Sequence, residues 1–154
     1  MTENIPTISS GNTVIDSIIN YKCDCAKQYN IDVKTEIQIP PIRILQEIDA
    51  TIIFGNLLDN AIEALQKVPA ENRLLEIMIR VVRNQCFIKI SNTCVGEHKW
   101  ENGRLLSDKS DKSLHGLGLQ SVEKSVLKYD GEMHVENAEG IFTVSIMLYI
   151  KMCK

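Results

Sequence analysis

The sequence predicts an α+β fold: a two-layer α/β sandwich with a mixed five-stranded sheet and three helices. Helical and strand-like apolar patterns follow one another along the 154 residues, and two strand-like runs are each followed directly by another after a short turn. Because strands come in adjacent pairs between helices, a regular βαβ series is excluded. The length is that of one domain, so residues 1–154 are expected to form a single unit with a tail at 1–11.

The first helix is expected to begin at Thr13, since Thr13-Val14-Ile15-Asp16 resembles a capping box. Apolar residues then recur at helical spacing for about four turns, and Asn30 is a plausible stop. Residues 32–39 alternate between apolar and polar side chains, which predicts a strand with one buried face. Pro40-Pro41 ends that strand.

A second helix is predicted from about Ile44 to Lys67, closed by Pro69. A third helix is predicted after a long segment that shows no sustained periodicity. The remaining expected elements are strands at 74–82 and 86–91 around the turn Arg83-Asn84-Gln85, a helix at 116–129 stopped by Gly131, and strands at 132–137 and 141–150 around Ala138-Glu139-Gly140.

Composition narrows the possible partners. Seventeen basic and twenty acidic residues give a net charge of −3, which offers no cationic field for nucleic acid or an anionic membrane. No apolar run is long enough to cross a bilayer, and the first ten residues lack the apolar core of a signal peptide, so a soluble chain is expected. The five cysteines, an odd number and scattered, favour a reducing compartment over a disulfide framework.

Two motifs carry chemistry. Asn56 and Asn60 lie four residues apart and therefore share one helix face, where their carboxamide oxygens are neutral, hard ligands suited to Mg²⁺. Some fifty residues later, Leu114-His115-Gly116-Leu117-Gly118-Leu119 predicts a glycine turn at a helix start, whose backbone N–H groups suit phosphate. Together they indicate a Mg-nucleotide site. Residues 93–115, between a strand and this turn, are expected to form a lid over it.

These segments resemble the ATP-binding domain of the gyrase, histidine kinase and MutL superfamily, the Bergerat fold. The likeness is greatest to sensor histidine kinases that read peptide pheromones in quorum sensing. It rests on Asn56-Leu57-Leu58-Asp59-Asn60-Ala61-Ile62-Glu63-Ala64 (the N box), Ile90-Ser91-Asn92-Thr93 (an altered first glycine box), and Ser107-Asp108-Lys109 with His115-Gly116-Leu117-Gly118-Leu119 (the lid lysine and second glycine box). Even the opening Ser10 to Ile18 is similar to the first helix of that subfamily.

The resemblance implies ATP and Mg²⁺ as cofactors. Asn60 would ligate Mg²⁺, and Asn56 would lie near the phosphates as the second catalytic amide. Asn92 stands where most relatives carry an aspartate that accepts from the adenine amino group. The remaining nucleotide contacts would be Lys109, Lys112 and His115 from the lid, and the backbone of Gly116, Leu117, Gly118 and Leu119.

Two departures from the family pattern bear on affinity. An amide at Asn92 accepts without a charge, so adenine binding should be weaker and less selective, because hydrogen bonds to charged groups contribute about 1.5–3 kcal/mol against about 1 for neutral ones. Glu63 lies three residues after Asn60, at a position where many relatives carry a basic residue that contacts the phosphates. The positive charge for the phosphates is then expected from the lid.

Hydrolysis should be poor, because Asn56 occupies the position at which hydrolytic relatives carry a glutamate, and an amide takes no proton at neutral pH. The expected function is delivery of the γ-phosphoryl to a histidine on a separate helical hairpin, since none of the three histidines here, at 98, 115 and 134, suits that role. The expected partners are the dimerisation and phosphoacceptor helices of a parent kinase and a response regulator, with no nucleic acid, and the isolated domain is expected to be monomeric. The parent is expected in the cell membrane with this domain in the cytoplasm.

Two alternatives stay open at this point. An anti-sigma-type serine kinase shares the fold but would need a carboxylate at the position of Asn56 and an unaltered glycine box. A degenerate module that binds a partner and no nucleotide is kept open by Glu63 and by the changed box.

Overall fold

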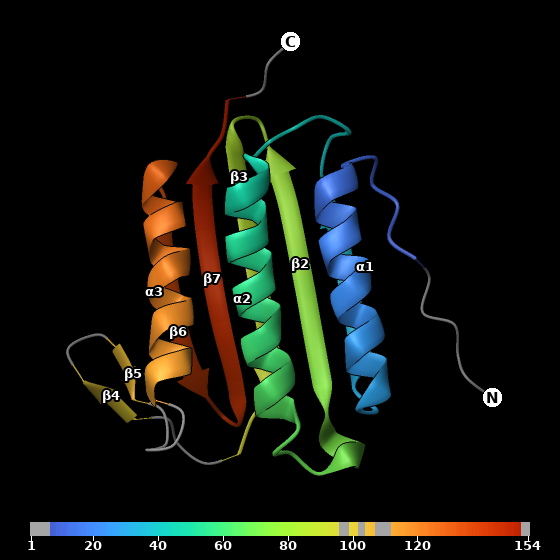
Figure 1. Cartoon of the computed structure of the whole chain (residues 1–154), viewed down its shortest axis with the longest axis vertical. Coiled ribbons are helices and arrows are strands. Elements are labelled where there is room, and N and C mark those ends of the chain that lie inside the picture. Colours follow the sequence, from blue (N-terminus) through green and yellow to red (C-terminus); the bar gives the residue numbers. More distant parts are fainter. Residues whose placement is uncertain (1–6, 96–98, 102–103, 107–111, 152–154) are drawn as a thin grey trace.

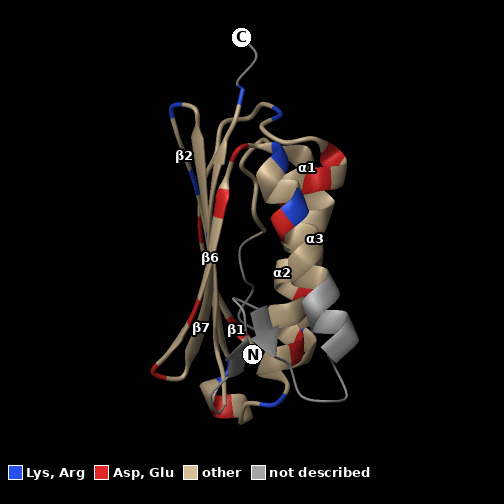
Figure 2. Cartoon of the chain, turned by 90° about the vertical axis from the view of Figure 1, so that its left-hand side faces the viewer, with Lys and Arg blue, Asp and Glu red and all other residues tan. Residues whose placement is uncertain are grey.

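The fold is described from a computed structural model of the chain. Its described residues are 7–95, 99–101, 104–106 and 112–151, and side chains are not described at 99–101, 104–106 and 112–117. Seen from the front, three helices lie across one face of a sheet (Figure 1). Seen from the side, the helices and the sheet form two separate layers (Figure 2). The predicted two-layer α+β sandwich is confirmed.

The main sheet has five strands in the order β1-β2-β3-β7-β6. The first pair, β1 and β2, is parallel, and the other three pairs are antiparallel, so the sheet is mixed as predicted. The parallel pair needs a crossover, which α2 supplies. The strand bounds are Asp32–Gln38 (β1), Leu74–Val82 (β2), Gln85–Thr93 (β3), Glu132–Ala138 (β6) and Ile141–Tyr149 (β7).

The helices are α1 (Thr13–Gln28), α2 (Glu47–Leu65) and α3 (Lys112–Lys128), with a short 3₁₀ turn, η1 (Ala70–Asn72). The middle helix, α2, is the most deeply packed, because its apolar side chains recur at helical spacing and meet the alternating inner residues of the strands. Burial of such side chains contributes roughly 1.5–3 kcal/mol each. Among those with almost no exposed surface are Ile53, Phe54 and Leu58 on α2, Leu75, Ile77 and Ile79 on β2, and Leu148 on β7.

The helix ends differ in detail from the predictions. The N-cap of α1 is Asn12, whose side chain accepts from the Ile15 N–H at 3.3 Å, so the predicted capping box at Thr13 is wrong. Asp16 reaches back instead and accepts from the Ser10 N–H at 2.9 Å. The predicted stop at Asn30 is confirmed, since this residue has a φ of 56° and its N–H closes onto Lys27.

The end of α3 repeats that motif with an aspartate. Asp130 has a φ of 51°, and the Gly131 N–H donates to the carbonyl oxygen of Val126 at 3.1 Å. Asp130, not Gly131, therefore takes the left-handed position. Glycine is needed at 131 because a Cβ there would lie 2.4 Å from the carbonyl oxygen of Met147.

Two differences fall in the predicted lid. The segment contains two short paired strands, β4 (Lys99–Glu101) and β5 (Arg104–Leu106), which no periodicity indicated. The third helix begins at Lys112 and not at Gly116, so the predicted start is wrong by one turn. Over the described residues, no helix combines the length and the apolar character needed to cross a membrane.

Candidate nucleotide site

The candidate site begins with two amides on α2. The Nδ2 group of Asn56 donates to the carbonyl oxygen of Ile52 at 2.8 Å, one turn earlier on the same helix. This bond fixes the amide, because its nitrogen is held against α2 and its oxygen is left to face away. Asn60 lies one turn further along the same helix face, and both side chains are half-buried. The predicted shared face of Asn56 and Asn60 is confirmed.

The backbone of α3 passes closely over both amides at Gly118. A Cβ on Gly118 would lie 3.4 Å from Oδ1 of Asn56 and 3.5 Å from Nδ2 of Asn60. Any larger side chain at this position would therefore fill the space in front of the two amides. The structure brings together, in this way, one residue of the predicted glycine turn and both residues of the predicted amide pair.

The third predicted site residue, Asn92, lies near the end of β3. Its side chain is 2% exposed, and its Nδ2 group donates to the carbonyl oxygen of Thr93 at 2.9 Å. No hydrogen bond from the described part of the chain reaches its Oδ1 atom. Because buried polar atoms in native proteins are normally satisfied, this oxygen is an acceptor suited to a ligand donor. An adenine amino group is such a donor.

Other predicted residues are placed only in part. Lys109 lies outside the described residues. Lys112, His115, Gly116 and Leu117 belong to the first turns of α3, and their side chains are not described. In a helix that begins at Lys112, the N–H groups from His115 onward enter the intrahelical ladder, and those of the first three helical residues lack such partners. The N–H groups best placed for an anion are therefore those of 112–114, about one turn before the predicted ones.

The two amides of α2 offer neutral oxygen ligands for a metal. Among the described residues, no group of three or more histidine, cysteine, aspartate or glutamate side chains could enclose an ion. Mg²⁺ commonly keeps several waters and is bound by one or two protein oxygens together with substrate phosphates. The half-buried amide of Asn60 fits that limited role.

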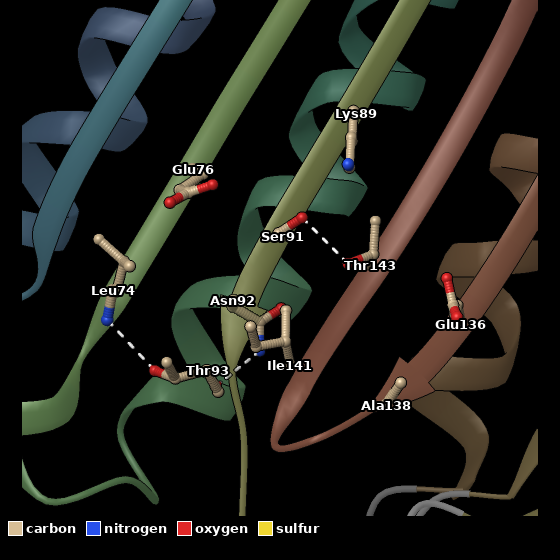
Figure 3. Close-up of a pocket in the computed structure, with 10 residues that line it drawn as sticks. All are labelled: Leu74, Glu76, Lys89, Ser91, Asn92, Thr93, Glu136, Ala138, Ile141 and Thr143. Atoms are coloured by element: carbon tan, nitrogen blue, oxygen red, sulfur yellow. Dashed lines mark hydrogen bonds between the residues drawn. The ribbon is translucent and has the colours of Figure 1, made fainter.

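A hollow of about 280 Å³ lies on the face of the sheet that the helices leave uncovered (Figure 3). Glu76, Lys89 and the bonded pair Ser91 and Thr143 project into it, with 3.0 Å between the two hydroxyl oxygens (Figure 3). Asn92 also lines it, whereas Asn56 and Asn60 do not. This hollow therefore belongs to the opposite side of the sheet from the amide pair.

A buried carboxylate, which the sequence analysis did not identify, lies at the other end of α2. Asp49 is 1% exposed and accepts from the Tyr129 hydroxyl at 2.8 Å and from Lys128 Nζ at 3.1 Å. Burial would raise the pKa of Asp49, but the hydrogen bonds from Tyr129, Lys128 and Ser125 hold it below its ordinary value. An acidic residue in a first helical turn was the only sequence signal, and its partners are some eighty residues away.

Comparison with known proteins agrees with this arrangement. Residues 45–149 match the family model described as GHKL domain. The chain therefore belongs to the GHKL domain family. No protein of curated function matches the sequence.

Solved structures of histidine kinases share the fold. The catalytic domain of histidine kinase ThkA superposes with a TM-score of 0.67 at 20% identity, covering 92% of this chain and 94% of that one. Histidine kinase AdeS of Acinetobacter baumannii gives 0.65 at 18% identity over 91% of this chain and 64% of the other. Full-length ShkA in complex with AMPPNP gives 0.68 at 14% identity, covering 99% of this chain and 32% of ShkA. At such identities the likeness establishes the fold alone.

Proposed function

We propose that this domain binds Mg-ATP and presents the γ-phosphoryl to a histidine on a separate helical hairpin of a parent two-component kinase. The observation that carries the proposal is the approach of α3 to α2 at Gly118, which faces both Asn56 and Asn60. Glycine there leaves room for a ligand beside the two amides. GHKL family membership supports the same reading.

The roles of the residues follow from their chemistry. Asn60 offers an amide oxygen to Mg²⁺, and Asn56 directs its oxygen toward the same space because its nitrogen is bonded to Ile52. Asn92 offers a buried acceptor to the adenine amino group. The first turn of α3 offers free N–H groups and a favourable dipole to the phosphates. Lys109 and Lys112 would add positive charge from the lid at 93–115.

The transfer needs alignment and charge neutralisation and no covalent step on this domain. Asn56 cannot accept a proton from water at neutral pH, so hydrolysis by the domain alone is expected to be close to background. The one histidine whose side chain is described, His134, lies in an exposed position on β6 beside Glu132. A phosphoacceptor on another domain of the parent is therefore part of the proposal, as is a response regulator downstream.

The finer assignments are also proposals. The N box and the altered first glycine box favour the peptide-pheromone subfamily and hence a role in quorum sensing. A cytoplasmic domain of a membrane-anchored parent, monomeric when isolated, follows from the same resemblance.

Titration calorimetry with ATP in the presence of Mg²⁺ tests the proposal. We expect binding at up to millimolar nucleotide, lost on Asn60→Ala and unchanged on Asn84→Ala, a matched amide in the exposed turn after β2. Absence of binding by the unmodified domain would contradict the proposal and favour a module that binds only a protein partner. Lys109→Ala should weaken ATP more than adenosine.

Adding a helical hairpin that carries a histidine tests the transfer itself. We expect acid-labile phosphohistidine on the hairpin. Labelling of a serine on a protein substrate would favour the anti-sigma class instead, and turnover of about 1 per second or more by the domain alone would contradict the role of Asn56.

A further inference from the structure

The neighbouring helices α2 and α3 run antiparallel and side by side (Figure 1). They meet at both ends. At one end Gly118 lies against Asn60, and at the other Tyr129 contacts Asp49. Asn60 lies eleven residues after Asp49, and Tyr129 lies eleven residues after Gly118. At about 1.5 Å of rise per residue, the two contacts are roughly 16 Å apart on each helix, so their spacing is the same on α2 and α3.

The contact at Asp49 consists of three hydrogen bonds between the two helices and the residues at their ends. The Tyr129 hydroxyl donates to Oδ2 of Asp49 at 2.8 Å and accepts from the Gln46 N–H at 2.9 Å. Lys128 Nζ donates to Oδ1 of Asp49 at 3.1 Å. Since the Gln46 side chain makes no capping bond to α2, a residue from the end of α3 takes over part of the capping.

The charges in this contact, those of Asp49 and Lys128, match the dipoles of the helices that carry them. Asp49 lies in the first turn of α2 and Lys128 in the last turn of α3. In an antiparallel pair these two ends are neighbours, so each charge is favourable for the dipole of its own helix and the two opposite charges attract each other. A buried carboxylate is strongly disfavoured without such partners, which ties α2 and α3 to one relative position.

We infer that the contact between Asp49 and Tyr129 is a positioning clamp that sets the register of α3 along α2 and thereby holds Gly118 against Asn56 and Asn60. Tyr129 and Asp49 do not touch the nucleotide in this scheme. They act through the helices, which are stiff over eleven residues. The inference rests on the proposed function for its consequence on nucleotide binding, but the register itself can be measured without nucleotide.

Two variants and two matched controls test the clamp. Tyr129→Phe removes one oxygen atom, and Asp49→Asn keeps the size of the side chain. Tyr149→Phe is the control for the first, since Tyr149 is 49% exposed, and Glu47→Gln is the control for the second, since Glu47 lies in the same helical turn in an exposed pair with Arg43. Both controls lie near the clamp and outside it.

The first readout is the NMR spectrum without nucleotide. We expect shifts of the Gly118 backbone amide and of the Asn56 and Asn60 side-chain amides in Tyr129→Phe, and none in Tyr149→Phe. A folded Tyr129→Phe domain in which these signals do not move, while residues beside Tyr129 do, would overturn the inference. This outcome does not depend on whether the domain binds ATP.

The second readout is the ratio of ATP to adenosine affinity, measured well below the melting temperature. We expect this ratio to fall about three- to tenfold in both clamp variants, because adenosine does not reach the amide pair. A role in stability alone would lower the melting temperature and leave the ratio unchanged, which contradicts the clamp. If the unmodified domain binds neither ligand, the proposed function fails and the NMR result alone decides the register. If Asp49→Asn does not fold, Tyr129→Phe still gives both readouts.

Discussion

The Oδ1 atom of Asn56 lies 3.4 Å from the position that a Cβ on Gly118 would take. This distance is ordinary van der Waals contact, so an alanine fits there without displacing backbone. Its methyl group would nevertheless fill the space beside the two amides. Gly118 therefore separates two properties that usually change together, namely stability and ligand binding.

We expect Gly118→Ala to stabilise the domain and to weaken Mg-ATP binding at least tenfold. Alanine is favoured over glycine inside a helix by about 1 kcal/mol, which corresponds to roughly 2–4 °C in melting temperature for a chain of this size. Thermal unfolding and calorimetry measure the two effects. Gly55→Ala on α2 is the control, because a Cβ there meets nothing within 4 Å. Equal ATP affinity in both variants would place the ligand elsewhere.

Asn92→Asp should change base selectivity and stability in opposite directions. A carboxylate accepts more strongly from the adenine amine than an amide does, so discrimination of ATP against GTP should rise. Without nucleotide, the variant loses the donor that Asn92 gives to the Thr93 carbonyl and buries a charge, which should cost about 1–3 kcal/mol. Competition binding and urea unfolding give the two values. If the discrimination of ATP against GTP does not rise, Asn92 does not belong to the base site.

Arg73 is expected to be a major stabilising residue of the fold. Its guanidinium donates to three backbone carbonyl oxygens at or just beyond the ends of α1 and α2, those of Tyr29 at 2.6 Å, Val68 at 2.8 Å and Gln66 at 3.1 Å. Arg73→Ala should lower the free energy of unfolding by about 2–3 kcal/mol. Arg80→Ala, which breaks an exposed pair with Glu36, should change it by less than about 1 kcal/mol. Urea unfolding compares the two, and equal losses would contradict this role.

The unfolding free energy should depend on the ionisation of Asp49. Hydrogen bonds from Tyr129 and Lys128 outweigh burial and lower the pKa of Asp49 in the folded state. A lowered folded-state pKa gives stability that is present above the unfolded-state pKa, about 3.9, and is lost as the pH falls through the folded-state value. The stability difference between the unmodified domain and Asp49→Asn should therefore shrink below about pH 4. A difference that is constant across this range would show that the charge is not involved.

Much of the fold could be predicted from local patterns. The alternation in residues 74–82 and 141–149 reports a strand with one buried face. The turn at Glu139 and Gly140, both with positive φ, is indicated by the glycine, which tolerates that conformation, and not by Glu139. Helix ends were less predictable. Asn12 and not Thr13 caps α1, because the choice depends on Asp16 binding the backbone of Ser10 and on Asn12 donating to the carbonyl oxygen of Ile42.

The start of α3 shows the same limit. Glycines at 116 and 118 suggested a helix beginning there, yet the helix begins at Lys112 and Gly118 lies within it. Glycine at 118 keeps a methyl group out of the space beside two amides that another helix carries, and this relation is a tertiary one. The short strands β4 and β5 were missed because three residues are too few to show a period.

The sequence by itself determined that Asn56 and Asn60 share one face of a helix, because a spacing of four residues has that consequence in any α-helix. Only the tertiary structure decided what faces them. The approach of Gly118, the buried oxygen of Asn92 and the contact between Asp49 and Tyr129 all join residues far apart in the chain. Such contacts depend on how helices and strands pack, and a local pattern carries no information about the partner that packing brings.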